Sequence, residues 1–310
     1  MTTRNTDDVK TAYVAPAICD LAGLHQDLAH WNHRRLAPSA PTPNWEAELR
    51  EEARMRWLEG VWIETLREEV AEQAAAAPSD VEGFIAWFEA LKRDGPGQGD
   101  QLFDWLATTA TLDDMKWFLT QEAAGEAGFD DLVALAQIKA PTTAKLELAR
   151  NYWDEMGRGN EGGMHGPMLE KAVEALHLNP SIEGTVWPSL ALANTLTAFA
   201  TTRRYAWHAI GALGVVELTA PTRVSRVAYG LKRLQAPPVV RKYFELHAVL
   251  DVKHADDWIA NVLRPLVSED PSRARHLAEG ALIRLNCGAK CFEAYRSHLW
   301  SAAPVQMAAE

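Results

Sequence analysis

The chain has 310 residues, of which 24% are charged and 47% hydrophobic, a balance that is typical of a folded globular protein and excludes disorder of the whole chain. Its 31 Lys and Arg against 42 Asp and Glu give a net charge of −11, so neither nucleic acid nor an anionic membrane is an expected partner. No stretch reaches the ~20 apolar residues of a membrane-spanning helix, and we expect no membrane association.

The first segment, residues 1–44, contains Pro38, Pro41 and Pro43 shortly before the first strong helical pattern. Because prolines interrupt regular structure, we predict an N-terminal arm here. The segment lacks the basic region, apolar run and cleavage site of a secretory signal. The whole chain has three cysteines, too few for a disulfide framework, and we expect a cytoplasmic protein.

Two helices are predicted after this arm. Between residues 45 and 77, apolar side chains recur every three or four positions, which indicates an amphipathic helix. The capping-box spacing from Ser79 to Glu82 begins a second helix, which runs to about Lys92. The glycine-rich stretch 95–99 lacks the pattern of a nucleotide-binding loop. We interpret residues 1–100 as an arm and helical extension packed on a core of residues 101–310.

The core is predicted to be helical throughout. It contains no series of alternating β-branched residues with hairpin turns, and no period of 20–50 residues repeats. The fold class is therefore all-α, a compact multi-helix bundle. Its helices are expected at 101–108, 112–127, 129–139, 143–156, 166–178, 188–200, 204–218, 221–233, 238–265, 271–285 and 288–300.

The most informative motif is His247, Asp251 and His254, at positions i, i+4 and i+7 of a predicted helix. At about 100° per residue, these three side chains share one helical face and can bind one metal ion. The competing interpretation is a solvated polar face, because His and Asp are common on helix surfaces. Partner residues elsewhere in the chain favour the metal.

Inward-pointing carboxylates and imidazoles from several helices build dinuclear sites in helical bundles. Glu155 ends one predicted helix, and His165 begins the next, ten residues later. Glu217 follows an apolar, glycine-containing run, where an unpartnered carboxylate would be costly. Glu122 and Glu126 stand four residues apart on the predicted helix 112–127, and one of them can point inward.

These residues resemble the heme-oxygenase-like diiron oxidases and oxygenases, known as iron-containing redox enzymes. The resemblance spans about residues 100–265. It rests on the His-x-x-x-Asp-x-x-His motif, on the segment Asn-Tyr-Trp-Asp-Glu-x-Gly-x-Gly at 151–159, and on a glutamate thirty residues before His247. One departure is Gly162, which stands where several members carry a second glutamate.

The resemblance implies a heme-oxygenase-like bundle that binds two iron ions per chain. It also implies a homodimer that activates O2, with an external electron donor as a further partner. The reaction would oxidise a small amine, amino acid or fatty acid by N-oxygenation, desaturation or C–C cleavage, and the sequence does not choose among them. The implied ligands are Glu122, Glu155, His165, Glu217, His247, Asp251 and His254, with Glu126 as the alternative to Glu122.

Two other function classes compete with this interpretation. A thiaminase-like hydrolase of the same fold would need a nucleophilic cysteine, but Cys19, Cys287 and Cys291 lie outside the segment of the resemblance. A noncatalytic helical binding or scaffold protein would carry the polar residues incidentally. Heme is disfavoured, because carboxylates beside the histidines suit oxygen-rich metal coordination better.

Overall fold

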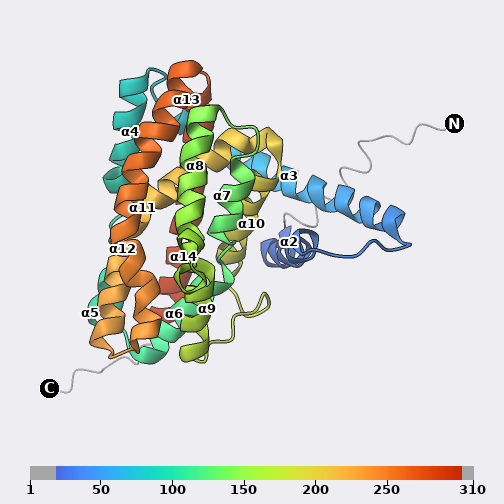
Figure 1. Cartoon of the computed structure of the whole chain (residues 1–310). Helices are drawn as coiled ribbons and strands as arrows, with labels where there is room; N and C mark the ends of the chain where they lie inside the picture. Colours follow the sequence, from blue (N-terminus) through green and yellow to red (C-terminus); the bar gives the residue numbers. More distant parts are fainter. Residues whose placement is uncertain (1–18, 302–310) are drawn as a thin grey trace.

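The computed structural model describes residues 19–301, and these form an all-helical bundle (Figure 1). Within this range the one β pairing is a single bridge between Met156 and Met164. The predicted all-α fold class is thus confirmed. The helices are α2 (Leu21–Leu36), α3 (Trp45–Ala75), α4 (Val81–Asp94), α5 (Gln101–Thr108), α6 (Leu112–Ala124), α7 (Phe129–Ala136), α8 (Thr142–Glu155), α9 (His165–Ala175), α10 (Trp187–Thr201), α11 (Ala206–Arg233), α12 (Pro238–Trp258), α13 (Arg264–Glu269) and α14 (Arg273–Ser301).

Helix α11 is the central element of the bundle. Its first four turns are mostly apolar, and even their polar side chains His208, Glu217 and Thr219 are buried, so neighbouring helices must cover this part of the helix. It contacts α12 and α14 along much of its length and also meets α5, α10, α4 and α7. Helix α8 in turn packs on α12, and Figure 1 shows these two helices running side by side. Helix α11 therefore packs against α12, the helix that carries His247, Asp251 and His254.

Helices α11 and α14 cross at two glycines. Gly211 of α11 lies against the Leu277 carbonyl, and Gly280 of α14 lies against the His208 carbonyl. A Cβ at either position would come within 2.0–2.1 Å of the facing oxygen, so neither position accepts a side chain without movement. The crossing therefore depends on backbone contact between the two helices.

Several helices are longer than the sequence predicts. The predicted break between the helices 204–218 and 221–233 does not occur. Pro221 lies inside α11, and Thr219, two residues before it, donates to the Val215 carbonyl (2.6 Å). An internal proline costs about 3 kcal/mol, and burial of α11 on both sides of it offsets that cost. The predicted break near Gly288 is also absent, because the whole of α14 is held against α10, α11 and α3.

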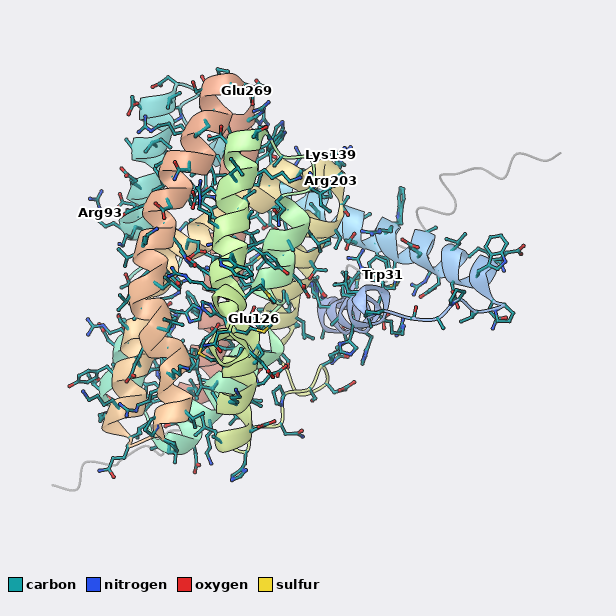
Figure 2. The ribbon with its side chains drawn as sticks, viewed as in Figure 1. Trp31, Arg93, Glu126, Lys139, Arg203 and Glu269 are labelled. Carbon is teal, nitrogen blue, oxygen red and sulfur yellow. The ribbon has the colours of Figure 1, made fainter. Side chains whose placement is uncertain are left out.

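The predicted N-terminal arm contains a helix. Residues 1–18 of the arm lie outside the described residues, whereas α2 begins after Asp20, whose carboxylate caps it by accepting from the Gly23 N–H (2.9 Å). Helix α2 packs on α10 at the side of the bundle, where Figure 2 shows Trp31. The Arg35 guanidinium stacks on the Trp31 ring at 3.8 Å from its centroid. In the described range, no helix has the length and apolar character needed to cross a membrane.

Gly211→Ala tests the crossing of α11 and α14. The new methyl group would collide with the Leu277 carbonyl, so we expect the free energy of unfolding to fall by about 2 kcal/mol, as in overpacked cores. Gly60→Ala in α3 is the control, because a Cβ there meets nothing within 4 Å. The control should gain about 0.5–1 kcal/mol. Urea unfolding followed by circular dichroism measures both, and unchanged stability of Gly211→Ala would contradict this account.

Candidate metal centre

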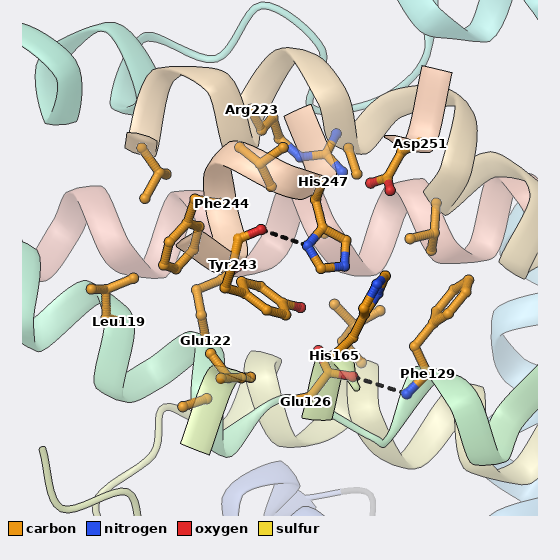
Figure 3. Close-up of a pocket in the computed structure, with 18 of the residues that line it drawn as sticks. Leu119, Glu122, Glu126, Phe129, His165, Arg223, Tyr243, Phe244, His247 and Asp251 are labelled. Carbon is orange, nitrogen blue, oxygen red and sulfur yellow. Dashed lines mark hydrogen bonds between the residues drawn. The ribbon is translucent and has the colours of Figure 1, made fainter. Parts of the chain in front are cut away.

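The bundle encloses a cavity of about 210 Å³ between α6, α9, α11, α12 and α14 (Figure 3). It contains most of the ionisable side chains that the sequence singles out. The members of the predicted ligand set that line it are Glu122, Glu126, Glu155, His165, Glu217, His247 and Asp251. His254 lies behind this wall, beside Glu217. The structure thus brings the whole predicted set into one region.

The first donor group consists of Glu155, His165 and His247, whose ligand atoms lie within 4.8 Å of one another. Glu155 is the last residue of α8 and His165 the first of α9. The chain between them folds back through two short 3₁₀ turns, so that His165 Nδ1 lies 2.6 Å from a Glu155 oxygen. The rings of His165 and His247 (Figure 3) meet edge to face, with centroids 4.5 Å apart and planes inclined by 72°.

The protonation of His247 suits metal binding. Its Nδ1–H donates to the Tyr243 carbonyl at 2.7 Å, so Nε2 is the nitrogen that remains free. Burial, with a further contribution from nearby His165, lowers the pKa of His247 to about 4. The imidazole is therefore neutral at physiological pH, which is the form that binds a metal.

The second donor group consists of Glu155, Glu217 and His254, again with ligand atoms within 4.8 Å of one another. Asn151 donates to one Glu217 oxygen at 2.6 Å, and the other Glu217 oxygen lies 3.4 Å from His254 Nδ1. His254 Nε2–H donates to Asp154 at 3.2 Å, which orients the ring. His254 Nδ1 is buried and makes no hydrogen bond, so a metal ion that displaces its proton can bind there.

Negative charge is crowded where the two groups meet. Burial, together with the charge of Glu217, raises the pKa of Asp251 to about 9, and burial also raises the pKa of Glu217. Burial alone would lower the pKa of His254, but Glu217 and Asp154 raise it to about 9. A divalent cation would neutralise this cluster better than protons can. Carboxylate and imidazole donors at these distances fit iron.

Comparison with known proteins agrees with this chemistry. The sequence matches the family model of iron-containing redox enzymes over residues 116–289, which is more than half of the chain and includes both donor groups. The chain belongs to the iron-containing redox enzyme family. The family that the motifs indicate is thereby confirmed, and iron is the metal that this family implies.

A solved structure shows the same fold. It is a CADD-like protein of unknown function from Nostoc punctiforme, with a TM-score of 0.50 and 16% sequence identity. The similarity covers 80% of this chain and 98% of that one. At this identity the likeness supports the all-α bundle and carries no functional information. A search of curated proteins finds no match.

Glu122 and Glu126 differ in their surroundings in this iron-containing redox enzyme. The prediction that they share one helix is wrong, because α6 ends at Ala124 and Gly125 caps it. Glu126 accepts from the Phe129 N–H at 3.1 Å (Figure 3), and burial and the charge of Glu155 raise its pKa to about 7. Glu122 instead accepts from the Tyr295 hydroxyl at 2.8 Å. Of the two, Glu126 is thus the glutamate whose pKa the charge of Glu155 raises.

A third histidine–carboxylate group lies elsewhere in the bundle. His208, His276 and Glu279 also bring their ligand atoms within 4.8 Å of one another. Here the protein supplies the counter-charge, because Arg67 donates to Glu279 at 2.8 Å and Arg275 at 3.1 Å. These bonds, with His208, outweigh burial and hold the pKa of Glu279 well below its usual range. This group needs no metal.

Helix α14 adds residues that the sequence analysis missed. Although Cys291 lies outside the segment of the resemblance, α14 returns through the bundle, so that Cys291 and Arg284 line the cavity. Arg223 of α11 lines it as well. Burial and the charge of Glu122 raise the pKa of the Cys291 thiol, so it stays protonated and is a poor nucleophile. Arg223 follows Glu217 by six residues, which is not a same-face spacing on a helix, so no local pattern links these residues to the site.

Gly157→Ala tests how the turn between the helices positions Glu155 and His165. Gly157 has φ +61°, and a Cβ there would lie 2.4 Å from the Gly163 carbonyl carbon. We expect a loss of about 1–3 kcal/mol in unfolding free energy and faster hydrogen exchange over residues 156–164. Gly166→Ala is the control, because a Cβ there meets nothing within 4 Å. If both variants exchange like wild type, the turn does not need glycine.

Proposed function

We propose that this protein is a nonheme diiron oxidase or oxygenase that uses O2. The observation that carries the proposal is that both donor groups share Glu155. A carboxylate common to two clusters can bridge two cations, whereas a single-metal site needs no shared ligand. Membership of the iron-containing redox enzyme family supports iron as the metal.

The proposed ligands divide between two ions. His165 and His247 would hold one ion, Glu217 and His254 the other, and Glu155 would bridge them. Asp251 would complete the second ion's shell, since its pKa responds to Glu217 and Glu155. Glu126 is preferred over Glu122 for the first ion, because Glu155 acts on its charge.

Iron at these positions would supply the redox chemistry with O2. The chain's own residues hold the neutral imidazoles in the right tautomer and surround the centre with apolar walls, among them Phe118, Leu119 and Phe244. Such walls limit the access of water to the reacting atoms. A small amine, amino acid or fatty acid is the proposed substrate class.

The remaining parts of the proposal follow the family resemblance. They are a homodimer, an external electron donor and a cytoplasmic location. The hydrolase alternative lacks support, because the Cys291 thiol is kept protonated. The scaffold alternative does not explain why Asp251 and Glu217 are buried together with raised pKa values. A scaffold would be more stable with an apolar core than with a cluster of like charges.

Iron stoichiometry tests the shared ligand. Wild type loaded anaerobically with Fe(II) should bind close to two irons per chain. His247→Ala and His254→Ala should each retain about one, because each removes a nitrogen from one donor group. Glu155→Ala should retain less than one, because it removes a ligand of both. Elemental analysis after desalting measures the content.

His276→Ala is the matched control for these variants. It removes a histidine from the third group, in which arginines already neutralise Glu279, so it should keep the wild-type iron content. Iron loss in His276→Ala equal to that in His247→Ala would contradict the assignment. Wild type that binds no more iron than Glu155→Ala would end the diiron proposal. O2 consumption on mixing the loaded protein with air tests the reaction class.

Asp154→Ala tests the orientation of His254. Without the carboxylate, the His254 ring loses the partner of its Nε2–H, and Fe(II) affinity should fall about 10–100-fold. Arg158→Ala is the control, because it removes the other partner of Asp154 and leaves the bond to His254 in place. Competition with a colorimetric chelator measures affinity. Equal affinities for the two variants would show that Asp154 does not orient the ligand.

A further inference from the structure

Two arginines line the cavity without a salt bridge. Within residues 19–301, neither Arg223 nor Arg284 forms an ion pair with any carboxylate. The one hydrogen bond of Arg223 is a long one to Gln98 (3.5 Å), and Arg284 Nε is buried with no partner at all. Both guanidinium groups are surrounded by protein atoms and face the cavity.

Other enclosed arginines of the chain are paired. Arg35 lies 2.7 Å from Glu59, and Arg67 lies 2.8 Å from Glu279. An enclosed cation without such a partner is costly, because it loses its hydration and gains no counter-charge. Arg223 shows that cost, because burial lowers its pKa to about 9. At this pKa the guanidinium is still charged at neutral pH.

The carboxylates near the arginines do not pair with them directly. Glu122 acts on the charge of both Arg223 and Arg284, and Glu126 acts on that of Arg284. Glu122 accepts from the Tyr295 hydroxyl and Glu126 from the Phe129 N–H, and neither forms a salt bridge with an arginine within residues 19–301. The two guanidinium groups are thus left without a direct anionic partner.

The charges around Arg223 differ from those around Asp251. The charges that act on Arg223 come from Arg284 and Glu122, and those that act on Asp251 come from Glu217, His254 and Glu155. Arg223 follows Glu217 by six residues on α11, which is about 9 Å along the helix axis. Apolar side chains also line the cavity, and the Arg223 guanidinium carbon lies 5.6 Å from the centroid of the Phe292 ring. The others include Phe103, Phe118, Leu119, Val224 and Val227.

Resting on the proposed function, we propose that Arg223 and Arg284 bind the carboxylate of the substrate, which is therefore a small carboxylic acid and not a simple amine. The acid group would sit between the guanidinium forks, and its apolar body would lie against the phenylalanine-rich wall. Guanidinium is well suited to this, because its planar fork matches carboxylate geometry. The carboxylate of the proposed ligand would be kept apart from the metal-binding carboxylates.

Binding of four six-carbon probes to metal-free protein tests the proposal. The probes are hexanoate, norleucine, hexanamide and hexylamine, and calorimetry measures their affinity. Without metal, a carboxylate cannot gain affinity by coordinating iron. At least one of the two acids should bind about tenfold or more tightly than hexanamide, as a charge-assisted hydrogen bond predicts, and hexylamine should bind least. Which acid binds better tells a fatty acid from an amino acid.

Arg223→Met and Arg284→Met should each weaken binding of the preferred acid about tenfold or more, with little effect on hexanamide. Both should also melt at a higher temperature than wild type, because each removes an enclosed charge without a salt-bridge partner. Arg226→Met is the control on the same helix, since Arg226 is exposed and pairs with exposed Asp104 (3.0 Å). If a Met variant does not fold, Arg223→Lys or Arg284→Lys keeps the charge and should lose only part of the affinity.

The proposal is overturned if neither acid binds more tightly than hexanamide, or if the arginine variants keep wild-type affinity. Iron content of the same variants separates the two proposals, because Arg223→Met and Arg284→Met should load iron like wild type. Acid binding by a chain that takes up no iron would leave the anion site standing and end the diiron centre. Iron loading by a chain that shows no preference for the acids would leave the diiron centre standing and end the anion-site proposal.

Discussion

The crowding of carboxylates inside one cavity is the constraint on which the rest of this structure depends. Glu155, Glu217 and Asp251 come from three different helices, are buried and line a common cavity. Burial and the charges of its neighbours raise the pKa of Asp251, and such a cluster opposes folding unless a cation joins it. The packing of α12 on both α8 and α11 holds the three groups together.

Histidines and carboxylates meet in two parts of this bundle, and their surroundings differ. Around Glu279, arginines from α3 and α14 neutralise the carboxylate, and the histidines there are structural. Among the described residues, Glu155 forms no ion pair with an arginine. His247 and His254 each present one nitrogen toward the site, because the opposite ring nitrogen donates to the Tyr243 carbonyl or to Asp154. The arginines that do reach the cavity are Arg223 and Arg284, beside Glu122. The cavity therefore contains both a cluster of carboxylates and imidazoles and two guanidinium groups without a salt bridge, an arrangement that can orient a small acid.

Local rules predict the helices of this protein well, and they fail where burial outweighs them. The all-α class and most helix positions follow from apolar periodicity over three or four residues. Pro221 and Gly288 mark predicted ends that do not occur, since packing against neighbours stabilises α11 and α14 through these positions. Helix α2 was missed because its few apolar residues lie in a proline-containing segment of polar composition.

For the site, the sequence by itself determined the ligand chemistry. The spacing of His247, Asp251 and His254 places them on one face wherever the helix lies, because helical geometry is local. Only the tertiary structure decided which carboxylates meet, that Glu155 belongs to both donor groups, and that Glu126 rather than Glu122 lies under the influence of Glu155. It also decided that α14 returns to the cavity with Arg284. Contacts between residues this far apart in the chain depend on how whole helices pack, and no local pattern encodes that packing.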